Sequence, residues 1–457
     1  MSFASSSLRR GGVCLAVVLI ISFLLIQGRV SAGEKGEAKE LFKPYIETLD
    51  NGLKVILLED HSAPVISYQT FFRVGSRNER PGITGISHFM EHMMFNGAKK
   101  YGPKEFDAIL EANGGYSNAY TSKDMTAYYE DFASSALELV IDLDSDRMRD
   151  LALDPKYLES EMGVVKEERR LRIDNSVDGQ MYEDLYAIAF KAHPYQWPVL
   201  GWMSDLERIN RDDCVNYYRT YYAPNNAVLV VVGDFDTEEA MALIHKYYDD
   251  IPRGKPYDDV RTVEPEQLGE RRAVIHKKAE LPAVLIGYHV PSVKSPDIYA
   301  LDILQQILTE GESSRLYQLL VRELGIAAYV YSSFTWRIDP DIFLFGAKCN
   351  PGKSTVELEK AIYSVLDSIA VSGVTEEELA KAKNKLIADF YRSLQTVNGK
   401  AGKIGRYEIL FGDYREMFRV QERYQSVTVD DIKRVAGRYF SDRNRSVVTL
   451  VPEKDEG

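Results

Sequence analysis

The stretch Tyr221-Tyr222-Ala223-Pro224-Asn225-Asn226, which leads into the apolar run from Val228 to Val232, has a counterpart near the other end of the chain. There Tyr439-Phe440-Ser441-Asp442-Arg443-Asn444 leads into the apolar run from Val447 to Val451. Both place turn-forming residues directly before a β-branched run, which is typical of a loop followed by a buried strand. The offset of about 218 residues is too long for a solenoid repeat and predicts one folding unit written twice.

Two more pairs of segments show nearly the same spacing. The helix-like stretch Asp154 to Arg172 resembles Thr375 to Leu394, and the strand-like stretch Val65 to Val74 resembles Val284 to Val290. Between the two copies, residues 253–272 are rich in charge and proline and show little periodicity, as expected for a linker. The sequence therefore predicts three segments: an N-terminal domain at 44–252, a linker at 253–272 and a C-terminal domain at 273–452.

Each half mixes β-rich apolar runs with helical patterns. In the first half, the strand-like runs are Lys54 to Leu58, Val65 to Val74 and Thr126 to Phe132. The helical patterns are Gly85 to Phe95, Pro103 to Ala112 and Ala133 to Leu151. Strands that follow one another in sequence, and are then followed by runs of helices, predict an α+β layer architecture and not a strict βαβ repeat.

The composition is that of an ordinary globular protein, with 45% hydrophobic and 27% charged residues in a chain of 457. Acidic residues outnumber basic ones by 69 to 56, and the net charge of −13 argues against nucleic acid as the main partner. Three cysteines are too few for a disulfide scaffold. Cys214 and Cys349 are either a disulfide pair or two small buried hydrophobic residues, and we favour the second interpretation.

Residues 1–32 have the pattern of a secretory signal. Arg9 and Arg10 form a positive start, residues 13–26 form an apolar run, and Val30-Ser31-Ala32 offers small residues for cleavage. The run is short for a membrane span, which needs ~20 residues. We therefore expect a periplasmic or secreted protein; the alternative is an uncleaved signal that anchors the chain to the membrane.

The segment from Ile86 to Phe95 contains the pattern His-x-x-Glu-His, the order of the inverted zinc-protease motif. On a helix, positions i and i+4 share a face, so His88 and His92 can bind one metal ion. Glu91 lies beside that face, where it can deprotonate a water whose pKa zinc lowers to about 7. The alternative is an ordinary helix, but these residues lie among large apolar side chains, and a buried charge needs a partner such as a metal.

A catalytic zinc site needs a third protein ligand and an open position. The best source is the helical stretch Leu158 to Arg169. Glu161 and Glu168 are two turns apart and face the same way, so one can bind the metal while the other orients the site. Spacing alone neither chooses between them nor excludes Glu167.

The second copy lacks the motif when Gly97 is aligned with Gly311. The counterparts are Asp302 for His88, Gln305 for Glu91, Gln306 for His92, Ala382 for Glu161 and Asp389 for Glu168. The second half therefore cannot build the same zinc site. We predict that the first half performs the chemistry and that the second shapes a chamber and holds substrate.

Over about residues 44–452 the chain resembles the M16 (pitrilysin-type, inverzincin) zinc metallopeptidases. It is most similar to the short bacterial members and to the β-subunit of the mitochondrial processing peptidase. The motifs that carry the resemblance are His88-x-x-Glu91-His92, Gly114-Gly115-Tyr116-Ser117-Asn118-Ala119-Tyr120-Thr121 with Asp124 and Tyr128, Glu161-x6-Glu168, His193-Pro194-Tyr195 before Pro198-x-x-Gly201, and Gly311-Glu312-Ser313-Ser314-Arg315-Leu316.

The resemblance implies one Zn²⁺ per chain, bound by His88, His92 and Glu168. It implies Glu91 as the general base and Glu161 as a second catalytic carboxylate that supports the site. The implied fold is two homologous α/β roll-like domains, each an antiparallel-rich sheet with helices packed on it, of the LuxS/MPP-like metallohydrolase type. Two such chains would form a clam-like chamber, as a homodimer or as a heterodimer with a metal-less M16-type partner.

The resemblance also implies substrate-binding residues. Asn118 and Ala119 lie in a region similar to the family's edge strand, to which an extended peptide adds as a further strand. Arg315 matches an arginine that acts with a tyrosine on the substrate carbonyl. The tyrosine position is Ala328 here, with Tyr329 one place later, and in a regular strand that shift moves a side chain to the other face. A partner subunit that supplies these groups is therefore expected.

The sequence thus predicts a zinc-dependent endopeptidase that hydrolyses peptides or unfolded protein segments. A non-catalytic peptide-binding or scaffold subunit is the main alternative, and the complete ligand set of the first half argues against it. A purely structural zinc is the other, but such sites have four protein ligands and we find three. Outside the motif, His193 is interpreted as a loop cap and not a ligand.

Overall fold

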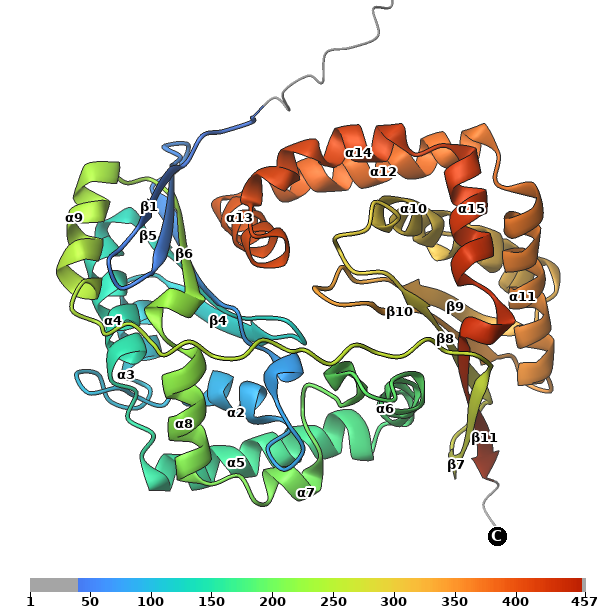
Figure 1. Ribbon diagram of the computed structural model, residues 1–457, viewed down its shortest axis with the longest axis horizontal. Coiled ribbons are helices and arrows are strands. Elements are labelled where there is room, and N and C mark those ends of the chain that lie inside the picture. Colours follow the sequence, from blue (N-terminus) through green and yellow to red (C-terminus); the bar gives the residue numbers. More distant parts are fainter. Residues whose placement is uncertain (1–39, 454–457) are drawn as a thin grey trace, which may run out of the picture. The chain divides into compact units, whose positions relative to one another are not determined.

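The computed structural model describes residues 40–453, which form one compact unit (Figure 1). The predicted signal segment, including Cys14, lies outside the described residues. Among residues 40–453, no helix is both long and apolar enough to cross a membrane.

The first half is built on a mixed sheet in the order β1-β2-β6-β3-β5-β4. All neighbouring strands are antiparallel except β2 and β6, which are parallel. Its strands are β1 (Tyr45–Thr48), β2 (Lys54–Glu59), β3 (Val65–Phe72), β4 (Tyr116–Thr121), β5 (Thr126–Ala133) and β6 (Ala227–Gly233). β4 forms one edge of this sheet.

The second half repeats this topology. Its sheet has the order β7-β11-β8-β10-β9, and again a single pair, β7 with β11, is parallel. Its strands are β7 (Arg271–Lys278), β8 (Ala283–Val290), β9 (Ala327–Ser333), β10 (Asp341–Cys349) and β11 (Arg445–Glu453). Strand by strand, this is the order β2-β6-β3-β5-β4 of the first half, so the fold is the predicted α+β class with two homologous units.

The helices follow the same duplication. The first half contains α2 (Ile86–Met93), α3 (Glu105–Ala112), α4 (Leu137–Arg149), α5 (Pro155–Arg169), α6 (Val177–Ala189), α7 (Met203–Leu206), α8 (Arg211–Tyr221) and α9 (Thr237–Tyr248). The second half contains α10 (Ile298–Thr309), α11 (Thr355–Ser372), α12 (Glu376–Ser393), α13 (Val397–Phe411), α14 (Val420–Ser426) and α15 (Val429–Tyr439). Short π-helical segments follow α5 at Arg170–Asp174 and occur at Tyr317–Glu323.

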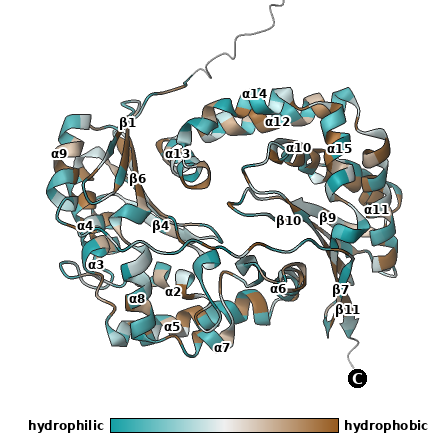
Figure 2. Cartoon of the chain, viewed as in Figure 1, coloured by the Kyte–Doolittle hydropathy of each residue, from teal (hydrophilic) through white to brown (hydrophobic). Residues whose placement is uncertain are grey.

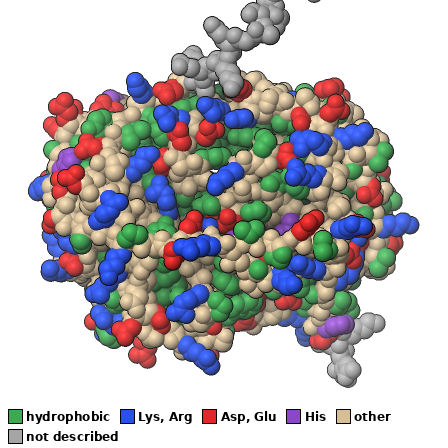
Figure 3. All heavy atoms as spheres, viewed as in Figure 1, with side chains coloured by type: hydrophobic (Ala, Val, Ile, Leu, Met, Phe, Trp, Pro, Cys, Tyr) green, Lys and Arg blue, Asp and Glu red, His purple; other side chains and the backbone are tan. Residues whose placement is uncertain are grey.

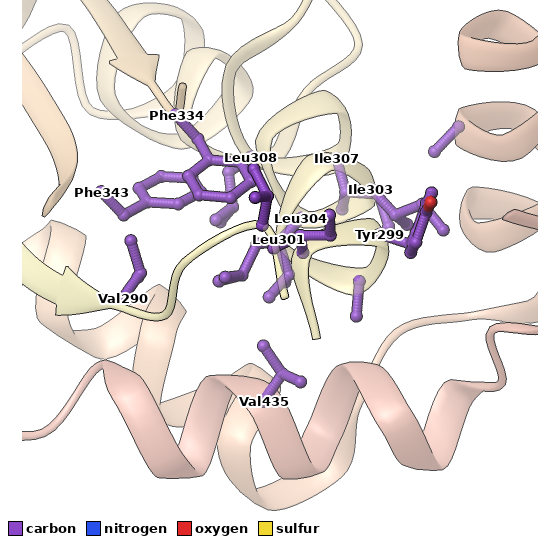
Figure 4. Packing of buried hydrophobic residues seen from close by; sticks show 14 of the residues in the cluster. Val290, Tyr299, Leu301, Ile303, Leu304, Ile307, Leu308, Phe334, Phe343 and Val435 are labelled. Atoms are coloured by element: carbon purple, nitrogen blue, oxygen red, sulfur yellow. The ribbon is translucent and has the colours of Figure 1, made fainter. Parts of the chain in front are cut away.

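Each half covers one sheet face with its own helices. One core, under the first sheet, joins residues such as Tyr68 and Val231 to α2, α4 and α9. In the second half, Leu301, Leu304 and Leu308 of α10 pack toward Phe334 and Phe343, as Figure 4 shows. Coloured by hydropathy, most helices have a hydrophilic and a hydrophobic side (Figure 2). Burial of apolar faces is thus what holds the layers together.

The other face of each sheet is covered by a helix from the opposite half. α13 packs on β3 and β6, where Lys54 donates to Glu408 at 2.8 Å and Asn398 donates to Asp131 at 2.9 Å. α6 packs on β7, β8 and β11, where Arg271 donates to the carbonyl oxygen of Ile188 at 2.9 Å. The two halves therefore exchange equivalent helices.

The exchanged helices start in the same way. The Ser176 hydroxyl accepts from the backbone N–H of Gly179 at 3.1 Å, and the Thr396 hydroxyl accepts from that of Gly399 at 3.0 Å. A Cβ on Gly179 would lie 2.0 Å from the carbonyl oxygen of Arg172, and one on Gly399 would lie 1.9 Å from that of Ser393. Glycine is required at both positions because each crossing helix begins tightly against the end of the preceding one.

Residues 253–270 contain no helix or strand, and β7 begins at Arg271, two residues before the predicted start of the C-terminal domain. Cys214 and Cys349 are free and fully buried, as favoured from the sequence, and burial raises their thiol pKa to about 12 and about 11. Acidic and basic side chains are interspersed over the face seen in Figure 3, so the net charge forms no single patch there.

Candidate metal centre

The predicted metal-binding helix is α2, which lies between α5 and β4 (Figure 1). Its first turn is held by Glu79, whose carboxylate accepts from the backbone N–H groups of Gly85 and Ser87 at 2.8 Å each. Burial raises the pKa of Glu79 to about 8. Gly85 has φ 89°, and a Cβ there would lie 2.7 Å from the carbonyl oxygen of Leu200. The segment before α2 thus fixes the position of the helix.

Three side chains converge where the sequence predicts the metal. Nε2 of His88 lies 3.4 Å from Oε2 of Glu168, and Nε2 of His92 lies 3.5 Å from the same oxygen. These contacts are longer than charge-assisted hydrogen bonds, which measure ~2.7–2.9 Å. They match the edge of a tetrahedron with bonds of ~2.1 Å, about 3.4 Å. Two imidazoles and one carboxylate, arranged in this way, fit Zn²⁺.

Glu161 lies on the other side of the His92 ring. Its Oε2 is 3.3 Å from Nδ1 of His92, so Glu168 and Glu161 face the two ring nitrogens. A carboxylate on the second nitrogen of a metal-binding histidine fixes the ring and its tautomer. Glu167 is exposed and pairs with Arg170 at 3.1 Å. Spacing left three glutamates open as the third ligand. Glu168 lies beside His88 and His92, and we call these three side chains the metal face. Glu161 lies behind His92, and Glu167 contacts neither histidine.

The two histidines of the site differ in pKa, and that of His88 suits metal binding. Burial, together with the charge of His92, lowers the pKa of His88 to about 4. His88 is therefore a neutral imidazole near neutral pH, which is the form that binds metals. For His92, burial opposes the charge, but Glu168 and Glu161 outweigh it and raise the pKa.

Glu91 points from the same helix toward β4. The Thr121 hydroxyl, at the end of β4, donates to Oε2 of Glu91 at 2.5 Å. Burial raises the pKa of Glu91, and the hydrogen bond from Thr121 offsets part of that rise. A carboxylate with a raised pKa beside a metal face is suited to accept and return a proton. The sequence did not single out Thr121, because its contact with Glu91 bridges a helix and a strand 30 residues apart.

The edge strand β4 carries Asn118 and Ala119. It pairs with β5 on one side only, and its residues alternate between exposed and half-buried. The Asn118 side chain donates to the hydroxyl of Tyr116 at 2.7 Å and accepts from the backbone N–H of Ala119 at 2.8 Å. β4 therefore leads along a free sheet edge to Thr121 and Glu91.

Arg172 is a further residue that sequence reasoning missed. It lies in the π-helical segment that follows α5, and its guanidinium forms an ion pair with Oε1 of Glu168 at 2.8 Å. The contact leaves Oε2 of Glu168 facing the two histidines. No helical pattern predicts the wider π turn that places this guanidinium.

Comparison with known proteins identifies the family. A family model described as "Insulinase (Peptidase family M16)" matches residues 54–201, and one described as "Peptidase M16 inactive domain" matches residues 208–386. A protein named "Zinc protease PqqE", from Helicobacter pylori, is 35% identical over 409 residues, covering 89% of this chain and 92% of that protein. The chain belongs to the M16 peptidase family.

Solved structures of M16-like proteins share the fold. A protease from Helicobacter pylori has a TM-score of 0.87 and 34% identity, covering 90% of this M16 chain and 100% of that chain. The periplasmic protease PqqL from Escherichia coli has a TM-score of 0.74 and 19% identity, covering 90% of this chain and 48% of its own. His88, Glu91, His92 and Glu168 all fall within the segment matched by the first family model.

In the second half of this M16 chain, the Arg315 guanidinium donates to both carboxylate oxygens of Glu378, at 2.6 and 2.7 Å. This pair ties Arg315 to the first turn of α12, and a role in substrate binding stays a prediction. His193 accepts from the backbone N–H of Tyr195 through Nδ1 at 3.2 Å, which confirms the interpretation as a loop cap.

One expectation about the tyrosine was wrong. β9 pairs with β10 through Ala327 opposite Cys349 and Tyr329 opposite Lys348, so Ala328 is the extra residue of a β-bulge. The bulge leaves Ala328 and Tyr329 both exposed. Tyr329 is therefore not turned to the opposite face, as a regular strand would require.

Proposed function

We propose that this M16 chain is a zinc-dependent endopeptidase that hydrolyses peptides or unfolded protein segments. The observation that carries the proposal is the joint geometry of the metal face and Glu91. His88, His92 and Glu168 would hold the ion, with their ligand atoms all within 4.8 Å of one another. Zinc, when bound, supplies Lewis-acid activation of the scissile carbonyl and of water.

The chain's own residues perform the remaining steps. An extended peptide adds to β4 near Asn118 and Ala119, and its main chain is held by strand-like hydrogen bonds. Glu91 takes a proton from the attacking water and delivers it to the leaving amine. Thr121 keeps the Glu91 carboxylate directed toward the substrate, while Glu161 and Arg172 hold the orientations of His92 and Glu168.

The test uses three variants of the chain lacking residues 1–32. Glu91→Gln is expected to keep zinc but to lose at least ~10²-fold in peptide hydrolysis, because the general base is gone. His88→Ala is expected to lose zinc and activity together. Glu167→Gln is the matched control, since this neighbour of Glu168 is exposed and bound only to Arg170.

The outcomes separate the proposal from a scaffold role. Full activity in Glu91→Gln would sink the assignment of the base. Stoichiometric zinc in the unmodified chain without turnover would point to a partner subunit that completes the site. Absence of both zinc and turnover would favour a non-catalytic subunit. Zinc is measured by elemental analysis on the same samples.

From the sequence, we also propose that the protein is exported from the cytoplasm and that it forms a dimer. The positive start, apolar run and small residues of 1–32 support a periplasmic or secreted location, which N-terminal sequencing of the mature protein from its native host tests. A dimer, with itself or with a metal-less M16-type chain, would enclose substrate more fully than one chain. Light scattering of the mature chain alone distinguishes the homodimer.

A further inference from the structure

A cavity of about 420 Å³ lies in the second half, among α10, α12, α13 and α14. Its lining includes two acidic, two aromatic and two basic side chains; these are Asp302, Asp389, Trp336, Tyr424, Lys403 and Arg406. The volume falls in the ~300–1,000 Å³ range of small-ligand pockets and can admit a side chain or a chain terminus.

The cavity occupies the counterpart of the metal centre. In the internal repeat, Asp302 of α10 corresponds to His88 of α2, and Asp389 of α12 corresponds to Glu168 of α5. The second half has thus kept the place between two helices where the first half binds metal. At this place the second half has no imidazoles, and the following helix, α13, provides the cations Lys403 and Arg406.

The acidic residues of the cavity are already satisfied. Oδ2 of Asp302 accepts from Trp336 Nε1 at 2.9 Å and from the Tyr424 hydroxyl at 2.6 Å. Asp389 pairs with Arg392 at 2.8 Å. These carboxylates are therefore bound by other groups and do not form ion pairs with the basic side chains of the cavity.

The basic residues, in contrast, have no anionic partner. Within residues 40–453, neither Lys403 nor Arg406 makes a hydrogen bond or ion pair with the protein; Lys403 has only the Phe390 ring, with its Nζ 6.0 Å from the centroid. They are one turn apart on α13 and line the same cavity, so both can reach one anion. Burial lowers the pKa of Lys403 and the charge of Arg406 lowers it further, while Asp302 offsets part of the change; a bound anion would raise this pKa.

α13, which lines this cavity, also packs on the face of the first sheet opposite to α2. Gly405, directly before Arg406, packs against Phe71 of β3, and Gly402 faces Gln69. The charge of Arg406 also acts on Tyr120, which precedes Thr121 on β4. Arg406 is thus close enough to β4 to influence the pKa of Tyr120, and a peptide added to the edge of β4 would pass near this guanidinium.

We propose that Lys403 and Arg406 form a carboxylate-binding subsite for the peptide substrate, at the place where the second half has lost the metal centre. The occupant is the C-terminal carboxylate of the peptide or an acidic side chain away from the scissile bond. This inference rests on the proposed peptidase function, because it takes a peptide on β4 as the ligand. The subsite binds by charge-assisted hydrogen bonds and makes no covalent change.

The experiment measures binding to the zinc-loaded Glu91→Gln chain, so hydrolysis does not interfere. The probe is one peptide without acidic residues, labelled with an uncharged BODIPY dye and made as the C-terminal amide, as the free acid, and as the amide with one internal Gln→Glu change. Fluorescence anisotropy gives Kd for each. We expect one of the acidic forms to bind ~10-fold tighter than the amide, and which one identifies the source of the carboxylate.

Adding Lys403→Gln and Arg406→Gln together is expected to bring the ratio of amide to acid Kd close to 1 and to leave the Kd of the amide unchanged. The control is Lys433→Gln, an exposed lysine of α15 outside the cavity, which should keep the ratio. Because neither cation of the cavity bonds to the protein, the melting temperature should not fall. A second variant pair, Lys403→Glu with Arg406→Glu, should reverse the preference.

Equal affinity for amide and acids in the parent chain, or a ratio that survives both variant pairs, overturns the inference. Hydrolysis of the amidated peptide by the chain with Glu91 intact tests the proposed function separately, since that substrate does not need the subsite. Turnover without acid preference refutes the subsite alone. Acid preference without turnover leaves the subsite supported and shows that this chain alone is not a working peptidase.

Discussion

Replacing Gly405 by alanine tests whether α13 is fixed on the first sheet as closely as the structure shows. A Cβ at this position would lie 2.0 Å from one ring atom of Phe71 and 2.4 Å from two others. Phe71 is only 1% exposed and lies in the core, so its ring has no free space to enter. One turn earlier, a Cβ on Gly402 would meet only the Gln69 side-chain oxygen, at an ordinary 3.6 Å. The two glycines are a matched pair on one helix.

The magnitudes follow from this pairing. Alanine in place of a helical glycine gains ~1 kcal/mol in both variants. Overpacking a tight core costs ~1–3 kcal/mol, and an overlap as deep as 2.0 Å belongs at the upper end. The helix-propensity gain cancels in the comparison, so Gly405→Ala should be less stable than Gly402→Ala by ~3 kcal/mol. For a chain of this length, that difference corresponds to ~3–4 °C in melting temperature.

Differential scanning calorimetry of both variants measures this difference. Adding Phe71→Leu to Gly405→Ala removes the overlapping ring, and we expect a coupling energy of ~2 kcal/mol, so that the double variant is no less stable than Phe71→Leu alone. Melting temperatures of the two glycine variants within ~1 °C of each other, or strict additivity with Phe71→Leu, would refute the packing argument. They would also weaken the placement of Arg406 beside β4.

Two further predictions concern the metal face and the cavity. Glu161→Gln should weaken zinc binding by ~10–100-fold while Glu167→Gln leaves it unchanged, because only Glu161 orients His92; competition with a chromogenic chelator measures this, and equal affinities would contradict the orienting role. Burial raises the pKa of Asp302 to about 7, so the folded chain holds this proton more tightly than the unfolded chain, where the pKa is ~3.9. The contribution of Asp302 to the free energy of unfolding is therefore fully present below ~pH 4 and is lost as pH rises toward 7. Over this range the free energy of unfolding falls by up to ~1.4 kcal/mol per pH unit. Asp302→Asn should remove that slope in urea titrations across the window, and an unchanged slope would show that other groups cause it.

The parts that sequence reasoning predicted depend on local patterns. The duplicated units, the strands β2, β3 and β5, and the helices around His88 and Glu161 follow from periodicity and turn residues within short windows. Seven-residue spacing also limited the third ligand to a few glutamates on one helix, although it did not choose among them. Cys214, Cys349 and His193 were interpreted correctly from their surroundings in the sequence.

The parts that it missed depend on contacts between distant segments. Glu79 holds the start of α2, and Thr121 holds Glu91, through hydrogen bonds that no local pattern encodes. The π segment that carries Arg172 and the bulge at Ala328 each insert an irregular residue into a regular element. Such irregularities depend on tertiary packing, and a strict two-residue strand period therefore predicted the wrong face for Tyr329.

The exchange of α6 and α13 makes the position of each half depend on the other. Each helix follows directly from the helix that carries the third metal ligand or its counterpart, α5 or α12, and each then crosses to the opposite sheet. Any shift of the second half moves α13, and with it Lys403 and Arg406, relative to β4. The same shift moves α6 and the π segment before it, which holds Arg172 against Glu168.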